Sequence, residues 1–112
     1  MPLHLLQRRD ADAWKSREQS RQDAIAKLRQ AQREHLAGQA MWVYGSILDR
    51  GKFRRHSDID VALERSPEGV SLYALQSLLT EATGHAIDIS LLDETRLRRK
   101  IEMSGQRWTG SG

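Results

Sequence analysis

The segment VYGSILDRGKFRRHSDIDVALE, residues 43–64, joins two short apolar runs through a basic loop, and carboxylates interrupt the second run. From Ile59 to Leu63 every second residue is apolar and branched, whereas Asp58 and Asp60 fall at the alternate positions. Because side chains of a β-strand alternate between its two faces, this pattern predicts a strand with one buried face and one acidic face. Burial in a core gives no reason for the two acids, which indicates a chemical role.

The flanking sequence places this strand in a series of helices and strands. Residues 11–37 lack Pro and Gly and are rich in Ala, Gln, Arg, Lys and Glu, which predicts a long helix that Gly38 can end. The expected order is helix (11–37), strand (40–45), strand (58–64), helix (71–84), strand (85–93), helix (93–105) and a short strand (106–108). The fold class is therefore α/β or α+β, with one small mixed sheet covered by helices.

Length and composition favour one compact domain. At 112 residues the chain is too short for a catalytic domain plus a separate substrate domain. It has no cysteine, and its N-terminal LHLL is followed at once by QRRDAD, which fits neither a signal peptide nor a membrane span. We therefore expect a cytoplasmic protein without a membrane partner.

The formal net charge of +3 comes from the N-terminal third of the chain. Residues 1–40 hold eight basic and five acidic residues, whereas 41–70 and 71–112 each hold five of either sign. An excess of three charges over forty residues is weaker than the clustered stripe of a dedicated nucleic-acid binder, so we expect no nucleic-acid partner. Between Lys15 and Asp23 nothing is apolar, so this part of the long helix is either solvated or available to a partner.

The carboxylates suit a divalent metal ion. Asp58 and Asp60 share a strand face roughly 6–7 Å apart, and two unpaired carboxylates that close repel each other unless a cation lies between them. Mg²⁺ prefers oxygen ligands and binds through one or two carboxylates plus substrate phosphates. Asp88 has the matching position in IDIS, and it supplies a third carboxylate if the two strands are neighbours. Three acids on one sheet face suit a two-metal site for displacement at phosphorus.

Gly45 and Ser46 come directly after the first apolar run and precede a turn. A glycine there lets the backbone approach a ligand closely, while backbone amides and the Ser46 hydroxyl bind phosphate oxygens. The pair is common by itself. Its combination with the downstream acids is specific, and it predicts a phosphate-binding loop beside a metal site.

The whole pattern resembles the minimal nucleotidyltransferase domain of the DNA polymerase β superfamily. The shared features are an apolar strand, Gly-Ser, a spacer with Arg-Gly, then Ser-Asp-Ile-Asp and a later strand with an acid, and they cover residues 41–108. The spacer GSILDRG is one residue longer than the family's usual Gly-Ser-x-Ala-Arg-Gly. The resemblance implies a polymerase β-like fold and the transfer of a nucleoside monophosphate, with AMP from ATP as the expected reaction.

The resemblance also implies roles for single residues. Asp58 and Asp60 would bind two Mg²⁺ ions, and Asp88 would complete the set and help to activate the incoming hydroxyl. The nucleotide triphosphate would be held by three small residues of the two motifs, namely Gly45, Ser46 and Ser57. The implied organisation is a helical extension over 1–40, the nucleotidyltransferase domain over 41–108 and a flexible tail over 109–112.

The acceptor of the nucleotide is the open question. Free-standing minimal domains resemble the antitoxin halves of two-gene toxin–antitoxin pairs, whose partner is a helical nuclease toxin that the domain binds and modifies with AMP. This reading explains the lack of room for a substrate domain, because the partner protein is the substrate. The alternative is a catalytically inactive binding module that neutralises such a toxin by contact alone, since a fold does not guarantee its chemistry.

Overall fold

The computed structural model of the chain describes residues 3–109, with side chains from residue 8 onward. The elements follow the expected order: α1 (Leu3–His35), β1 (Met41–Tyr44), the 3-10 turn η1 (Ser46–Leu48), β2 (Ile59–Leu63), α2 (Leu72–Thr83), β3 (Ile87–Leu91), α3 (Arg98–Ser104) and β4 (Gln106–Trp108). The expected α+β class with a small mixed sheet and a long N-terminal helix is confirmed. Of the expected tail at 109–112, residues 110–112 lie outside the part of the chain that the structure describes.

The four strands form one sheet in the order β3-β2-β1-β4. β1 is antiparallel to both β2 and β4, whereas β2 and β3 are parallel and are joined by the crossover helix α2. The register sets Asp60 directly opposite Asp88 on β3 and opposite Tyr44 on β1. The sheet therefore aligns three polar side chains across adjacent strands.

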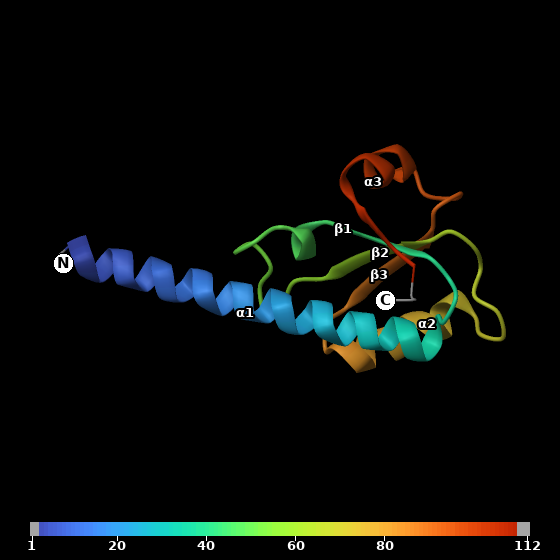
Figure 1. Cartoon of the computed structure of the whole chain (residues 1–112), viewed down its shortest axis with the longest axis horizontal. Helices are drawn as coiled ribbons and strands as arrows, with labels where there is room; N and C mark the ends of the chain where they lie inside the picture. Colours follow the sequence, from blue (N-terminus) through green and yellow to red (C-terminus); the bar gives the residue numbers. More distant parts are fainter. Residues whose placement is uncertain (1–2, 110–112) are drawn as a thin grey trace.

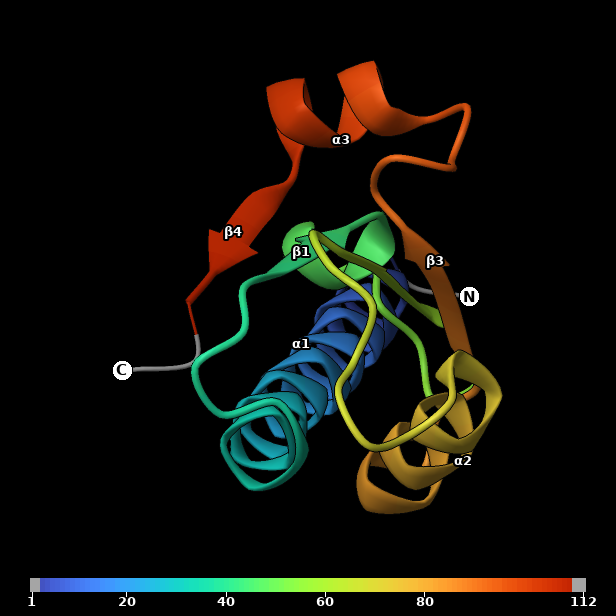
Figure 2. The same ribbon diagram turned by 90° about the vertical axis from the view of Figure 1, so that its right-hand side faces the viewer.

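The two faces of the sheet have different covers (Figure 2). α1 and α2 lie side by side against one face, and α3 lies alone over the other. The α1–α2 face holds the main core, which includes Leu28, Val43, Ile59, Val61 and Leu75. The α3 face has a buried cluster of three residues, Ala62, Leu92 and Ile101, flanked by Trp42 and Tyr44.

Helix α1 has two different halves (Figure 1). Its C-terminal half packs on the sheet and on α2, with Ala24, Leu28 and Ala31 fully buried. Its N-terminal half extends past the rest of the molecule, which explains the elongated extents of 57 × 28 × 24 Å. Residues 24–36 thus contribute to the same core as the sheet.

The two ends of α2 have a clear physical basis. The Ser71 hydroxyl accepts a hydrogen bond from the Ala74 amide and caps α2, and Gly84 ends α2 with a left-handed backbone. Two boundaries differ: α1 begins at Leu3 rather than near residue 11, and β2 begins at Ile59. Asp58 therefore precedes the strand in which the sequence placed it. No helix among the described residues is long and apolar enough to span a membrane.

Candidate functional site

The acidic face of the sheet brings together residues from three strands. Asp60 on β2 is the register partner of Asp88 on the parallel strand β3, and Tyr44 on β1 lies opposite Asp60. Neighbouring strands lie about 4.8 Å apart, so the two carboxylates are side by side on one face. The sequence offered Asp88 as a third carboxylate on the condition that the two strands are neighbours, and the sheet pairs them in this register.

Gly45 ends β1 beside these acids in a conformation that favours glycine. Its φ is 84° and its ψ is −157°, a region that other residues rarely adopt. A Cβ added at this position would lie 2.4 Å from Oδ2 of Asp60, which is closer than real contacts allow. The absence of a side chain here therefore keeps backbone and carboxylate in close approach, which is the arrangement expected of a ligand-binding loop.

A cavity of about 310 Å³ opens over the acids. The sheet contributes Tyr44, Gly45, Asp60 and Asp88, and α3 forms the opposite wall. Leu97, just before α3, and Lys100, Ile101 and Ser104 of α3 line the same space. The site is thus a cleft between the acidic sheet face and a short helix whose lining residues include Lys100 and Ser104.

Burial and neighbouring negative charge both act on the ionisable groups of the cleft. The pKa of Asp60 is raised above its usual value of 3.8, first by burial and then by the negative charges of Asp88 and Asp58. The pKa of Tyr44 is also raised, mainly by burial, with both Asp60 and Asp88 contributing. A cation in the cleft would reverse this repulsion, because it favours the charged form of each carboxylate.

Three of the predicted site residues do not line the cavity, namely Ser46, Ser57 and Asp58. Asp58 is exposed ahead of β2, and it does not line the cavity. The Ser57 hydroxyl accepts a hydrogen bond at 2.8 Å from the Arg54 amide and so closes a turn of its own loop. The Ser57 carbonyl lies 2.9 Å from Nδ1 of His85, whose ring packs on Phe53. His85 therefore anchors the loop that contains Ser57 and Asp58.

Ser46 follows Gly45 and opens the turn η1, where it is half-buried. The loop after it is held from behind by α1. Arg21 is buried, and its Nη1 donates to the Ile47 carbonyl at 3.1 Å. Its Nε and Nη2 donate to both carboxylate oxygens of Glu18 at 2.8 and 2.9 Å.

The other end of this loop, at Gly51, has three contacts with α1. The Gly51 amide donates to Glu18 at 3.2 Å, and its carbonyl accepts from Nε of Arg17. The Trp14 ring covers its Cα so closely that a Cβ there would meet the indole nitrogen at 2.0 Å. We call Trp14, Arg17, Glu18 and Arg21 the α1 latch, since they fix both ends of the segment that follows Gly45 and Ser46.

The fit of the site to a metal ion depends on what else binds with it. Within residues 3–109, no group of three histidine, aspartate or glutamate side chains is arranged to hold a metal ion by itself. Asp60 and Asp88 form a pair, and Mg²⁺ commonly binds through one or two carboxylates with the remaining ligands from substrate phosphates and water. The pair therefore fits a metal that arrives with a phosphate-bearing ligand.

Sequence reasoning missed several residues of this region. Tyr44 and Lys100 line the cleft, and the α1 latch lies behind it, yet none stands in a recognisable motif. Tyr44 has a signal in hindsight, because it is the last strand residue before Gly45 and shares the register line of the acids. Three of the latch residues, Arg17, Glu18 and Arg21, belong to the stretch without apolar positions. Their polar contacts span 26 to 34 residues of chain and leave no periodic pattern.

Comparison with known proteins gives one result at the level of the fold. No family model matches the chain, and no curated protein matches it. A chain of a solved structure described as "Crystal structure of the toxin-antitoxin with AMP-PNP" is similar with a TM-score of 0.58 at 21% sequence identity. The match covers 74% of this chain and 71% of that chain. The two chains therefore share a fold.

Proposed function

We propose that this protein is a Mg²⁺-dependent nucleotidyltransferase that moves AMP from ATP to a hydroxyl group of a partner protein. The observation that carries the proposal is the cleft in which Gly45, Asp60 and Asp88 meet. A backbone at φ 84° against a carboxylate of raised pKa, with a second carboxylate in register beside it, suits a metal-bound triphosphate. The sequence motif around these residues supports the same chemistry.

In this proposal, different residues of the cleft would bind the metal ion and the phosphate groups. Asp60 and Asp88 would hold Mg²⁺, which when bound neutralises phosphate charge and polarises the phosphoryl oxygens. Backbone amides at Gly45 and Ser46 would bind phosphate oxygens, and Lys100 across the cleft would contribute a positive charge. Asp58 is exposed just before β2, and its proposed role as a ligand of the metal ion rests on the sequence motif alone.

The transfer itself replaces a phosphoanhydride bond of ATP with a phosphoester bond to the acceptor. The acceptor oxygen forms a bond to the α-phosphorus, the bond from that phosphorus to the bridging oxygen breaks, and pyrophosphate leaves. The proton of the acceptor hydroxyl goes to a carboxylate, and Asp88 is the more exposed of the two acids on the sheet. Positioning and charge stabilisation supply most of the rate in phosphoryl transfer, so a small site with few groups is sufficient.

The proposed partner is the toxin of a toxin–antitoxin pair. The fold is shared with a chain from a toxin–antitoxin structure that contains AMP-PNP, which supports both a protein partner and a nucleotide ligand. The described residues form one sheet with a buried cluster on each face, and a separate partner protein would supply the acceptor. The N-terminal half of α1 extends beyond that core and offers a surface for a partner, with Trp14 44% exposed at its base.

Calorimetry on the purified chain tests the nucleotide site. ATP should bind with Mg²⁺ and bind weakly without it, and Asp60→Asn should remove the metal dependence. Asp12→Asn on the exposed part of α1 is the matched control, since it makes the same change of charge away from the cleft. Equal ATP affinity with and without Mg²⁺ in the unchanged protein would refute the metal–nucleotide site.

A second experiment addresses the acceptor. The chain should co-purify with the product of the adjacent gene, and incubation with ATP and Mg²⁺ should increase that partner's intact mass by one AMP. One observation favours the competing function, a binding module without catalysis: no group of three metal-ligand side chains is arranged for a metal within the described residues. A stable complex whose partner never gains AMP would establish that function instead.

A further inference from the structure

A second cavity lies on the other side of the molecule, where the C-terminal half of α1 meets the edge strand β4. Its volume is about 400 Å³, and it is lined by Arg29, Gln32 and Arg33 of α1 together with residues 106–109. The acid cleft lies under α3 on the opposite sheet face. The lining of this second cavity includes three arginines and no acidic residue.

Contacts within the protein hold three side chains of this cavity in place, namely Arg29, Gln32 and Arg107. The Arg29 guanidinium lies 4.1 Å from the centre of the Trp108 ring, a cation–π contact that fixes its plane. Arg107 is tied to Glu64 through Nε at 2.5 Å and Nη2 at 3.2 Å. Gln32, 2% exposed, donates to the carbonyls of Trp108 and Gln39 and joins α1 to β4. A ligand would therefore meet an ordered wall.

The charge of this wall is only partly neutralised. Glu64 offsets Arg107, but neither Arg29 nor Arg33 has an ion pair with a carboxylate among residues 8–109. These two arginines are four residues apart on one helix, where like charges destabilise each other. The position of Arg33 in the last turn of α1 suits the helix dipole, but the dipole does not account for Arg29, one turn earlier.

We propose that the Arg29–Arg33 cavity is a binding site for a phosphate-bearing anion. Guanidinium groups match phosphate oxygens with paired hydrogen bonds, and two of them from one helix face can hold one dianionic group. The Trp108 ring is 5% exposed and is covered by Arg29, so a base cannot stack on it. Recognition therefore acts on the phosphate and not on a base or sugar.

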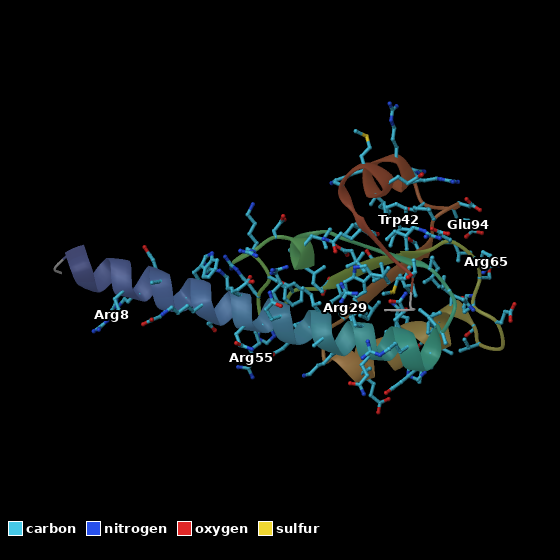
Figure 3. All side chains as sticks on the ribbon, in the orientation of Figure 1. Arg8, Arg29, Trp42, Arg55, Arg65 and Glu94 are labelled. Atoms are coloured by element: carbon cyan, nitrogen blue, oxygen red, sulfur yellow. The ribbon has the colours of Figure 1, made fainter. Side chains whose placement is uncertain are left out.

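Titration with inorganic pyrophosphate in the presence of a metal chelator tests this site by itself, since the acid cleft is then without its metal. Arg29→Gln/Arg33→Gln should weaken pyrophosphate binding about tenfold or more, because charged hydrogen bonds are lost. Arg8→Gln/Arg9→Gln is the matched control: it removes the same charge from the protruding part of α1, where Figure 3 shows Arg8 far from Arg29. The control should bind as the unchanged protein does.

A single variant guards against a folding defect. Arg33→Gln removes a side chain that has no hydrogen bond or ion pair within the part of the chain that the structure describes, so it should fold normally and still bind pyrophosphate more weakly. A short single-stranded RNA serves as the second probe, and tighter binding of RNA than of pyrophosphate would assign the phosphate to a nucleic-acid backbone. No binding of either probe, or equal loss in the Arg8/Arg9 control, would overturn the proposal.

Discussion

The two faces of the sheet differ in what they bury. The face under α1 and α2 holds a continuous apolar core, in which Leu28, Val43 and Leu75 are completely buried. The face under α3 holds three buried residues and leaves Asp60 half-buried and Asp88 exposed. A single helix of seven residues cannot cover both the sheet and the acids, so an open cleft remains.

This division has a simple physical reason. Burying apolar area contributes about 25 cal/mol per Å², so the face with two long helices provides most of the stability. Unpaired carboxylates cost stability, and they are tolerated where the other face already holds the fold. The following predictions test whether stability and chemistry are separated in this way.

Leu28→Ala should have the largest effect, a loss of about 2–5 kcal/mol in the free energy of unfolding, because it leaves a cavity in the main core. Ile101→Ala is the comparison on the α3 face, where the residue is 1% exposed but belongs to a small cluster that can collapse around the gap. We expect its cost at the lower end of the same range. Urea unfolding of both variants measures the difference, and equal costs would mean that both faces stabilise the fold alike.

Gly45→Ala should come next, because it combines backbone strain with a steric clash. A non-glycine residue at this φ costs about 1–3 kcal/mol, and the new Cβ would collide with Oδ2 of Asp60. Gly84→Ala is the matched control, since its φ is 74° but no atom lies within 4 Å of the added Cβ. Both variants should lose stability in thermal unfolding, whereas only Gly45→Ala should weaken Mg²⁺–ATP binding.

The two faces also differ in how far the sequence predicts them. The strand β2 was predictable because the branched residues Ile59, Val61 and Leu63 stand at every second position, and this period survives in the register. The acid pair was predictable because Asp60 and Asp88 have equivalent positions in two similar strands. Asp58 was placed inside β2 because the alternation extends one residue further than the strand pairing does.

The α1 side of the Gly45 loop could not be predicted. Arg21 is a charged residue in a polar stretch, and sequence alone indicates an exposed position, whereas it is buried. Its burial depends on Glu18 and on a carbonyl 26 residues away, which is a tertiary arrangement without a local signal. The same holds for Lys100, which lines the cleft only because α3 folds back over the sheet.

Arg21→Met should cost about 1–3 kcal/mol, because the Ile47 carbonyl and Glu18 lose their buried donor. It should also weaken Mg²⁺–ATP binding, since the loop that follows Ser46 loses its support. Lys27→Met is the control on an exposed face of the same helix, and it should leave both properties unchanged. Normal ATP affinity in a folded Arg21→Met protein would show that the α1 latch supports the fold and not the site.

The smallest expected effects concern pH, and they have opposite signs in the cleft and in the α1 latch. The raised pKa of Asp60 means that the folded state holds this proton more tightly than the unfolded chain does. The associated stability is present at low pH and is lost as pH rises from 3.8 through the raised pKa. In Asp60→Asn this loss disappears. At neutral pH in metal-free buffer, the free energy of unfolding of the variant should therefore exceed that of the unchanged protein. The difference should be less than about 1 kcal/mol, because solvent screens the group.

Glu18 in the α1 latch should show the reverse dependence. Hydrogen bonds from Arg21 and then Gln22 lower its pKa from 4.5 to about 2, so the folded state binds this proton less tightly than the unfolded chain. Its contribution is present above pH 4.5 and is lost as pH falls towards 2. Glu18→Gln should therefore reduce stability at neutral pH, and it should remove the part of the stability that Glu18 loses as pH falls towards 2. Asp60→Asn should instead remove the part of the stability that Asp60 loses as pH rises from 3.8. Urea unfolding across this range in metal-free buffer measures both, and a shift of both variants in the same direction would contradict the separation of a stabilising face from a chemical one.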